Sequence, residues 1–119
     1  MLTVLGEIKG VNHNIKNGNV SQLEVHYQNF LDNHSGADRE KVIALLIMNH
    51  QNATPLKERQ PVNDEQIKLA EKYGSLIVET SVLLRMFEKY KFGELSSDKC
   101  FEIIKNKKGI LEENDLDNY

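Results

Sequence analysis

The sequence predicts an α/β protein with a mostly parallel central sheet of about three strands and helices packed against it. Three apolar segments, at residues 2–9, 42–48 and 76–79, have the length and composition of strands. Amphipathic helical segments separate them, and strands that alternate with helices are typical of parallel sheets with crossover helices. The 119 residues, 39% hydrophobic and 28% charged, are enough for one domain with its own core.

The first part of the chain predicts a strand, a turn and a helix. Residues 2–9 (LTVLGEIK) are rich in apolar and β-branched residues. Residues 11–19 (VNHNIKNGN) have a turn composition with an Asn-Gly pair. From about residue 20 to 33 apolar residues recur at helical spacing, and Asn19 or Ser21 is expected to cap the start of this helix.

The middle of the chain predicts a buried strand, a long loop and a second helix. Residues 42–48 (VIALLIM) are an unbroken apolar run, which predicts a strand covered on both faces. The 49–62 loop carries both prolines and is long for a compact domain, which indicates function or mobility. Asn63 is expected to cap the next helix, with Gln66 completing a capping box, and Gly74 to end it.

The last third predicts one more strand and two helices. Residues 76–79 (LIVE) form the strand, and helices are expected at about 80–92 and 97–108, packed together on the sheet. Residues 111–119 (LEENDLDNY) are acidic and are predicted to form a flexible tail. The domain would therefore span residues 1–110, and the tail residues 111–119.

Composition restricts the classes of partner. A formal net charge of -3 argues against a polybasic nucleic-acid arm or a membrane-surface patch, although a small local basic site is compatible with it. Cys100 is the single cysteine, so no intrachain disulfide can form, and one thiol suits a reducing compartment. No apolar run approaches the ~20 residues of a membrane-spanning helix, and the N-terminus lacks a secretory-signal pattern. We expect a cytoplasmic protein without a membrane partner.

One acid and one base lie two positions apart in the first strand. Side chains alternate along a strand, so Glu7 and Lys9 should share a face. For an arbitrary E-x-K, an ion pair on a solvated sheet edge is the usual explanation. Here Gly6 and Gly10 flank the pair and the strand is otherwise apolar. We place the pair at the carboxyl-terminal rim of a central strand, where α/β proteins bind ligands.

Several segments together resemble one family. V-L-G-E-I-K-G, the helix beginning V-S-Q-L, and V-I-A-L-L-I-M-N look like the second half of a PD-(D/E)xK nuclease-like domain. Arg59 and Pro61, the segment A-E-K-Y-G and the stretch L-I-V-E-T-S-V-L-L-R-M-F extend the resemblance over roughly residues 2–104. The resemblance implies a restriction-endonuclease-like core that hydrolyses phosphodiester bonds of DNA with Mg²⁺ or Mn²⁺.

The resemblance also implies roles for four residues. Glu7 would be a carboxylate ligand of Mg²⁺, and the backbone carbonyl of Ile8 a further oxygen ligand. Lys9 would orient or activate the attacking water, and Gln22 would hold the water or the substrate; an exposed helix amide explains Gln22 equally well. Mg²⁺ prefers oxygen ligands and acidifies bound water, and an ammonium group stabilises charge on the phosphate.

The chain departs from the family pattern before the E-x-K. The family has an aspartate on the preceding strand, but no acid precedes Glu7, and a later acid such as Asp32 or Asp38 would lie in the wrong place. We expect a fragment of a longer protein that binds metal weakly and cuts slowly or not at all. The missing strand would leave an open edge, so a homodimer through residues 2–9 is a further hypothesis. The alternative function is a non-catalytic interaction module of the same fold, using this edge or the 49–62 loop.

The other candidate residues have simpler explanations. No zinc-ligand spacing connects the histidines, His13, His26, His34 and His50. A solvated loop position explains His13 better than a phosphate contact does, whereas His26 follows Gln22 by one helical turn and should share its face. Arg59 could meet a phosphate or a carboxylate, with a surface arginine as the simpler interpretation. We expect Cys100 to be a buried structural thiol, and the core to include Met48, Met86 and the phenylalanines.

Overall fold

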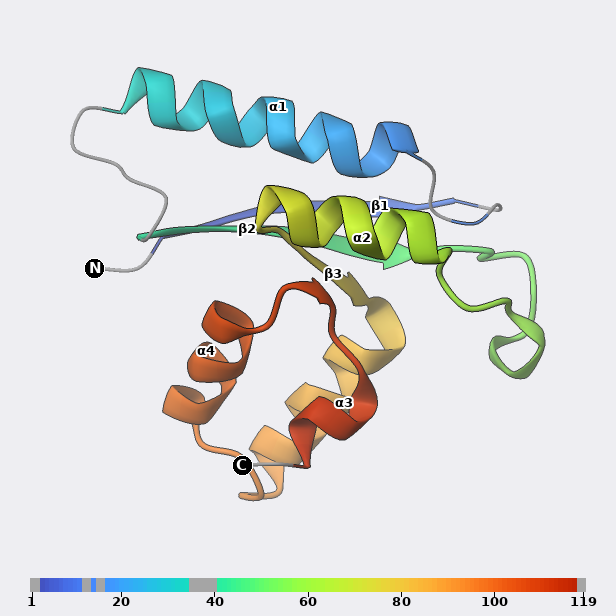
Figure 1. The fold of residues 1–119 in the computed structure, drawn as a ribbon. Helices are drawn as coiled ribbons and strands as arrows, with labels where there is room; N and C mark the ends of the chain where they lie inside the picture. Colours follow the sequence, from blue (N-terminus) through green and yellow to red (C-terminus); the bar gives the residue numbers. More distant parts are fainter. Residues whose placement is uncertain (1–2, 12–13, 15–16, 35–40, 118–119) are drawn as a thin grey trace.

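The structure is a computed structural model that describes residues 3–11, 14, 17–34 and 41–117. It has one four-stranded sheet in the order β1-β2-β3-β4, with every neighbouring pair parallel (Figure 1). The α/β class and the parallel sheet are therefore confirmed, with one strand more than the sequence predicts. The strands are β1 (Thr3–Gly10), β2 (Val42–Asn49), β3 (Leu76–Glu79) and β4 (Gly109–Ile110).

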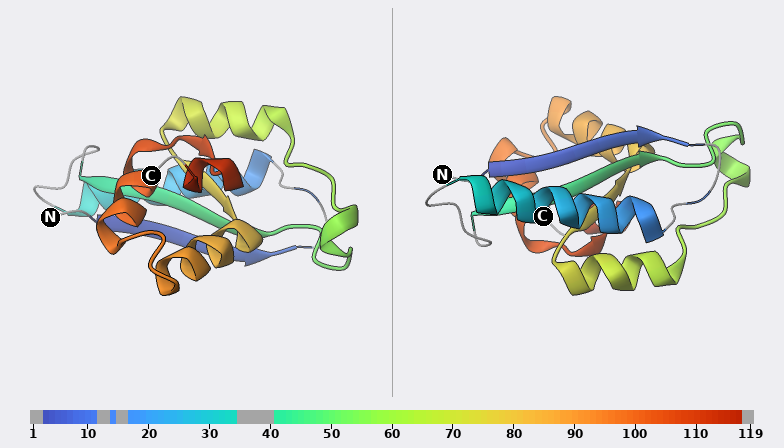
Figure 2. Two further views of the ribbon diagram at one scale, coloured as in Figure 1. Left: turned by 90° about the horizontal axis from the view of Figure 1, so that it is seen from below. Right: turned by 90° about the horizontal axis from the view of Figure 1, so that it is seen from above.

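Helices cover both faces of the sheet (Figure 2). One face carries α1 (Asn17–Asn33) and α2 (Asp64–Tyr73), and the other carries α3 (Thr80–Lys91) and α4 (Ser97–Asn106). Two 3₁₀ turns complete the described elements, η1 (Leu56–Glu58) in the long loop and η2 (Glu113–Leu116) near the chain end. Each face has its own apolar core, because the sheet separates the two helical layers.

The unbroken apolar run of β2 supplies both cores. Its even-numbered side chains pack beneath α1 and α2, and its odd-numbered side chains pack toward α3 and α4. Leu46 and Met48 are 0% exposed. A strand with helices on both faces has no polar side, which is the physical reason for its sequence.

β1 has a different environment, because it pairs with β2 and lies at the edge of the sheet. Its odd-numbered side chains are half-buried on the face of α1, whereas its even-numbered positions are exposed. Ile8 is 79% exposed and Val4 41%. The prediction that Glu7 and Lys9 belong to a central strand is therefore wrong, although both lie in the carboxyl-terminal half of a strand.

The end of the chain also differs from the prediction. Residues 109–110 add β4 to the sheet, and η2 follows it. Leu111 and Leu116 are each 1% exposed, because they complete the core beneath α3 and α4. Asp117 Oδ1 lies 3.0 Å from Lys89 Nζ, and this hydrogen bond raises the pKa of the lysine. The prediction of a flexible tail from residue 111 is thus wrong as far as residue 117.

The connection from β3 to β4 crosses the face opposite to the first two connections. Because the strand order never reverses, this third connection has the opposite hand to the others. Parallel connections are nearly always right-handed, so a fold with both hands is unusual. The exceptional connection contains two helices and ends in a strand of two residues.

Helix ends follow the sequence only in part. α1 begins at Asn17, ahead of the predicted start. Asn63 takes the N-cap position of α2 but makes no side-chain capping hydrogen bond, so the capping box with Gln66 is wrong. Gly74 ends α2 as predicted, with φ 73° in the left-handed region. Ser96 caps α4 by accepting a hydrogen bond from the Lys99 N–H at 3.2 Å.

The core prediction is correct for the two methionines and wrong for several phenylalanines. Met48 and Met86 are buried, but Phe87, Phe92 and Phe101 are 57%, 76% and 55% exposed. An apolar groove of about 280 Å³ lies between α3 and α4, lined by Leu83, Met86, Phe87, Tyr90, Ser97, Cys100, Phe101 and Ile104. Cys100 is only partly buried there, and its burial raises the pKa of the thiol.

Two glycines with positive φ offer a matched test of how tightly β4 is placed. Gly93 and Gly109 have φ of 77° and 88°, so alanine at either should cost about 1–2 kcal/mol of backbone strain. A Cβ at Gly109 would also lie 2.8 Å from Glu71 Cγ, whereas a Cβ at Gly93 would meet nothing within 4 Å. Urea unfolding should show a larger loss of stability for Gly109→Ala than for Gly93→Ala. Equal losses would contradict the close packing of β4 against α2.

Candidate functional site

Glu7 and Lys9 both point from β1 toward α1. The Glu7 carboxylate contacts the His26 ring through Oε1 and Nδ1. The Lys9 ammonium donates a hydrogen bond to Gln22 Oε1 at 2.5 Å. Four side chains from two elements thus form one polar group, which we call the β1–α1 cluster: Glu7, Lys9, Gln22 and His26.

The helix positions of the cluster follow from helical periodicity. Gln22 and His26 are four residues apart and therefore lie on one side of α1. Val20, Leu23 and Tyr27 are buried against the sheet, and the Tyr27 hydroxyl donates to the Val42 carbonyl at 2.9 Å. This packing fixes the rotation of α1, so that Gln22 and His26 meet the side chains of the edge strand.

Only one of the two oxygens of the Glu7 carboxylate has a partner among the described residues. Its side chain is 16% exposed, and Oε1 is taken up by His26. Oε2 is buried and has no hydrogen-bond partner among the described residues. A buried polar atom without a partner costs free energy. Oε2 is therefore the atom of the cluster at which a cation or a hydrogen-bond donor would be stabilised.

The backbone of Ile8 faces the open edge of the sheet. Thr3 N–H donates to Lys41 O at 2.8 Å and Val11 N–H donates to Asn49 O at 3.1 Å, so odd-numbered residues direct their backbone groups toward β2. Since these groups alternate along a strand, the Ile8 carbonyl points away from β2. It lies next in the chain to Glu7, on the side of β1 that the sheet leaves open.

The cluster contains a single carboxylate. Within the described part of the chain, no group of three or more His, Cys, Asp or Glu side chains could hold a metal ion. Asp32 lies on α1 ten positions after Gln22, which corresponds to about 15 Å along a helix. His13 and Asp38 fall outside the described residues.

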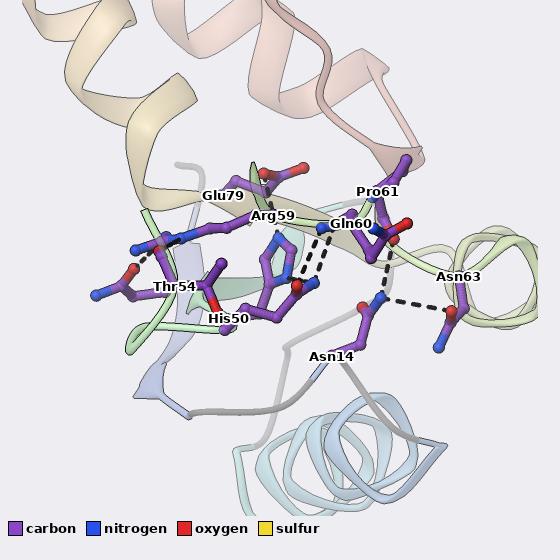
Figure 3. Close-up of polar contacts among 10 residues, drawn as sticks. Asn14, His50, Thr54, Arg59, Gln60, Pro61, Asn63 and Glu79 are labelled. Carbon is purple, nitrogen blue, oxygen red and sulfur yellow. Dashed lines mark hydrogen bonds and ion pairs between the residues drawn. The ribbon is translucent and has the colours of Figure 1, made fainter. Parts of the chain in front are cut away.

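A second polar network occupies the carboxyl ends of β2 and β3 (Figure 3). His50 is 1% exposed, and its Nε2 lies 3.3 Å from Glu79 Oε2. Its Nδ1 lies 3.1 Å from Gln51 Nε2. An amide nitrogen only donates, so Nδ1 accepts and the ring proton belongs on Nε2, facing the carboxylate. Because both ring nitrogens have partners, His50 connects two strands and has no nitrogen left for catalysis.

Arg59 holds the 49–62 loop together from within (Figure 3). Its Nε donates to the Thr54 carbonyl and its guanidinium to Asn49 Oδ1, both at 2.8 Å. The Gln51 amide pairs with the backbone of Gln60 through two hydrogen bonds of 3.0 Å. Asn14 Nδ2 donates to the Pro61 carbonyl at 2.9 Å. The guanidinium thus has neutral oxygen partners inside the loop, which favours the structural interpretation of Arg59.

Of the residues predicted from the sequence, Glu7, Lys9 and Gln22 belong to the β1–α1 cluster, whereas the side chain of Ile8 is exposed on the other face of β1. Sequence reasoning suggested a shared face for Gln22 and His26, but not the contact of His26 with Glu7. It also missed the pairing of His50 with Glu79. Their positions in the sequence could have indicated this pairing, because both residues lie at the carboxyl ends of adjacent parallel strands.

Comparison of the chain with protein-family models, with curated proteins and with solved structures finds no match. The fold and the local geometry therefore carry the functional argument. Among the described residues, no helix is both long enough and apolar enough to cross a membrane.

The role of Arg59 can be tested with two exchanges in the same loop. Arg59→Lys removes the planar guanidinium that reaches two acceptors at once, and hydrogen bonds to charged groups contribute about 1.5–3 kcal/mol. Amide hydrogen exchange at Asn52 and Thr54 should become at least roughly tenfold faster. Lys57→Arg, at an exposed position, is the matched control and should leave exchange unchanged. Unchanged exchange in both variants would show that Arg59 does not hold the loop.

Proposed function

We propose that the chain is a nuclease-like domain in which the β1–α1 cluster binds Mg²⁺ or Mn²⁺ and supports phosphodiester hydrolysis of DNA. The observation that best supports this function is the buried Oε2 of Glu7, which has no hydrogen-bond partner among the described residues, on the strand face that Glu7 shares with Lys9. The carbonyl of Ile8, the next residue in the chain, is directed to the open edge and is the second oxygen donor of this proposal. A hard cation prefers such oxygen donors and keeps several waters.

Each residue of the cluster has a distinct task in this proposal. Glu7 Oε2 and the Ile8 carbonyl would hold the cation, which supplies an acidified water and neutralises charge on the phosphate. Lys9 would place its ammonium beside the scissile phosphate and the attacking water. Gln22 fixes that ammonium by accepting its hydrogen bond, and His26 fixes the other oxygen of Glu7.

The proposal includes weak metal binding and weak activity for the chain by itself. One carboxylate and one carbonyl are few protein ligands for Mg²⁺, which is usually held by one or two carboxylates and phosphate oxygens. A second carboxylate from outside the cluster would complete the site. The net charge of -3 provides no general attraction for DNA, so substrate binding would depend on local groups such as Lys9. A cytoplasmic location remains part of this proposal.

A second function is favoured by the exposed apolar surfaces. Ile8 on β1 and the groove between α3 and α4 present apolar side chains to solvent. Clustered apolar exposure is typical of interaction surfaces. In this alternative the domain is a non-catalytic interaction module, and the β1–α1 cluster is an ordinary polar contact between a strand and a helix.

Metal-dependent thermal stability separates the two functions. At a metal concentration tenfold above Kd, binding stabilises the folded state by about 1.4 kcal/mol, which raises Tm by several degrees. We expect Mg²⁺ or Mn²⁺ to raise the Tm of the wild-type chain and to leave the Tm of Glu7→Gln unchanged. Glu58→Gln, an exposed carboxylate in η1, should respond like the wild type.

Plasmid nicking tests the chemistry in the same samples. We expect slow, metal-dependent nicking by the wild-type chain that is lost in Lys9→Ala while the metal-induced shift in Tm remains. An equal metal response in wild type and Glu7→Gln would exclude Glu7 as a ligand. No response to millimolar Mg²⁺ or Mn²⁺, with no nicking, would favour the interaction module.

A further inference from the structure

The open edge of β1 has the features of a strand that pairs with another strand. Its even-numbered residues direct their N–H and C=O groups away from β2, because the odd-numbered ones bond to it. The strand is eight residues long and contains neither proline nor a charged side chain at an even position. Proteins usually protect exposed edges with such residues, or with bulges and covering segments. Val4 and Ile8, the two apolar side chains beside these groups, are exposed.

We propose that two copies of this chain associate by antiparallel pairing of β1 with β1 about a two-fold axis at Gly6. Val4 of each copy then lies opposite Ile8 of the other, and Gly6 lies opposite Gly6. Each of these opposed pairs exchanges two backbone hydrogen bonds. The two sheets become one continuous sheet, and no edge of β1 remains open.

Backbone geometry restricts the possible registers. In an antiparallel ladder, residues that direct their backbone groups outward oppose one another. Even-numbered residues of β1 must therefore oppose even-numbered residues of the second copy. This parity also places both α1 helices on the same face of the joined sheet, since opposed side chains share a face.

Side-chain chemistry selects among the remaining registers. Centring the axis on Glu7 would oppose two like charges, which is destabilising. An axis at Leu5 would place Ile8 opposite residue 2 of the second copy, outside β1. An axis at Ile8 would place Val4 opposite residue 12, which also lies outside β1. Only the axis at Gly6 places Val4 of one copy opposite Ile8 of the other, so that the two exposed apolar side chains contact each other. This self-complementarity is the reason for choosing a second copy of the chain as the partner.

The dimer would bring the two β1–α1 clusters to one face of the joined sheet, on either side of the axis. Glu7 of each copy would lie opposite Leu5 of the other, and Lys9 opposite Thr3. The dimer requires no metal and no catalysis, so its test is separate from that of the nuclease function.

Cross-linking at two glycines tests the register. Opposed residues of a hydrogen-bonded pair have Cα atoms about 5.5 Å apart, whereas Gly10 of the two copies would be about 26 Å apart. In a Cys100→Ala background, Gly6→Cys should therefore cross-link with a short bismaleimide and Gly10→Cys should not. A Cβ at Gly6 meets nothing within 4 Å, and one at Gly10 is 3.4 Å from Asn52 Nδ2, so both variants should fold. Failure of Gly6→Cys, or equal cross-linking of both, would overturn this register.

Light scattering coupled to size exclusion tests the interface itself. We expect a dimer for the wild type and a monomer for Ile8→Lys, because a charge on the edge opposes pairing. Leu56→Lys, which changes another exposed apolar residue in η1, should remain dimeric. A wild-type chain that stays monomeric at high concentration would overturn the proposal, as would a dimer that Ile8→Lys leaves intact.

Discussion

The parallel pairing of β1 with β2 is the constraint on which the candidate site depends. It runs in register from Thr3 opposite Val42 to Gly10 opposite Asn49. This register directs the odd-numbered side chains of β1 to the face of α1 and leaves the even-numbered backbone groups on the free side. The carboxylate, the ammonium and the outward carbonyl of three consecutive residues thus come together at one sheet edge. Without that pairing, Glu7 and Lys9 would have no fixed relation to Gln22 and His26.

The His50 network and the β1–α1 cluster differ in how many of their buried polar atoms have hydrogen-bond partners. The network of His50, Glu79 and Gln51 uses both ring nitrogens of the histidine and ties a loop to two strands. The β1–α1 cluster instead leaves one buried carboxylate oxygen without a partner among the described residues. A fully bonded network rigidifies a structure, whereas a buried acceptor without a partner needs an explanation such as a catalytic role or a bound ion. For this reason the less buried cluster is the better functional candidate.

Local periodicity was sufficient to predict much of the fold. The unbroken run of β2, the shared face of Glu7 and Lys9, and the left-handed Gly74 all follow from rules that span a few residues. Strand order does not follow from such rules. An open edge at residues 2–9 was expected only from the family resemblance, and nothing in the sequence showed that Ile8 is exposed. The acidic composition of residues 111–117 concealed Leu111 and Leu116, whose burial depends on a core formed by distant segments. Phe87 and Phe101 show the converse, since an aromatic side chain at helical spacing can lie on the outer side of a helix.

The position of the last strand has a consequence for shortened forms of the chain. β4 and η2 cover β3 and fill the layer beneath α3 and α4. Ile110 of β4 also packs against the core beneath α1 and α2. Removing the residues after Asn106 would therefore uncover apolar surface on both faces of the sheet, and large exposed apolar patches promote aggregation.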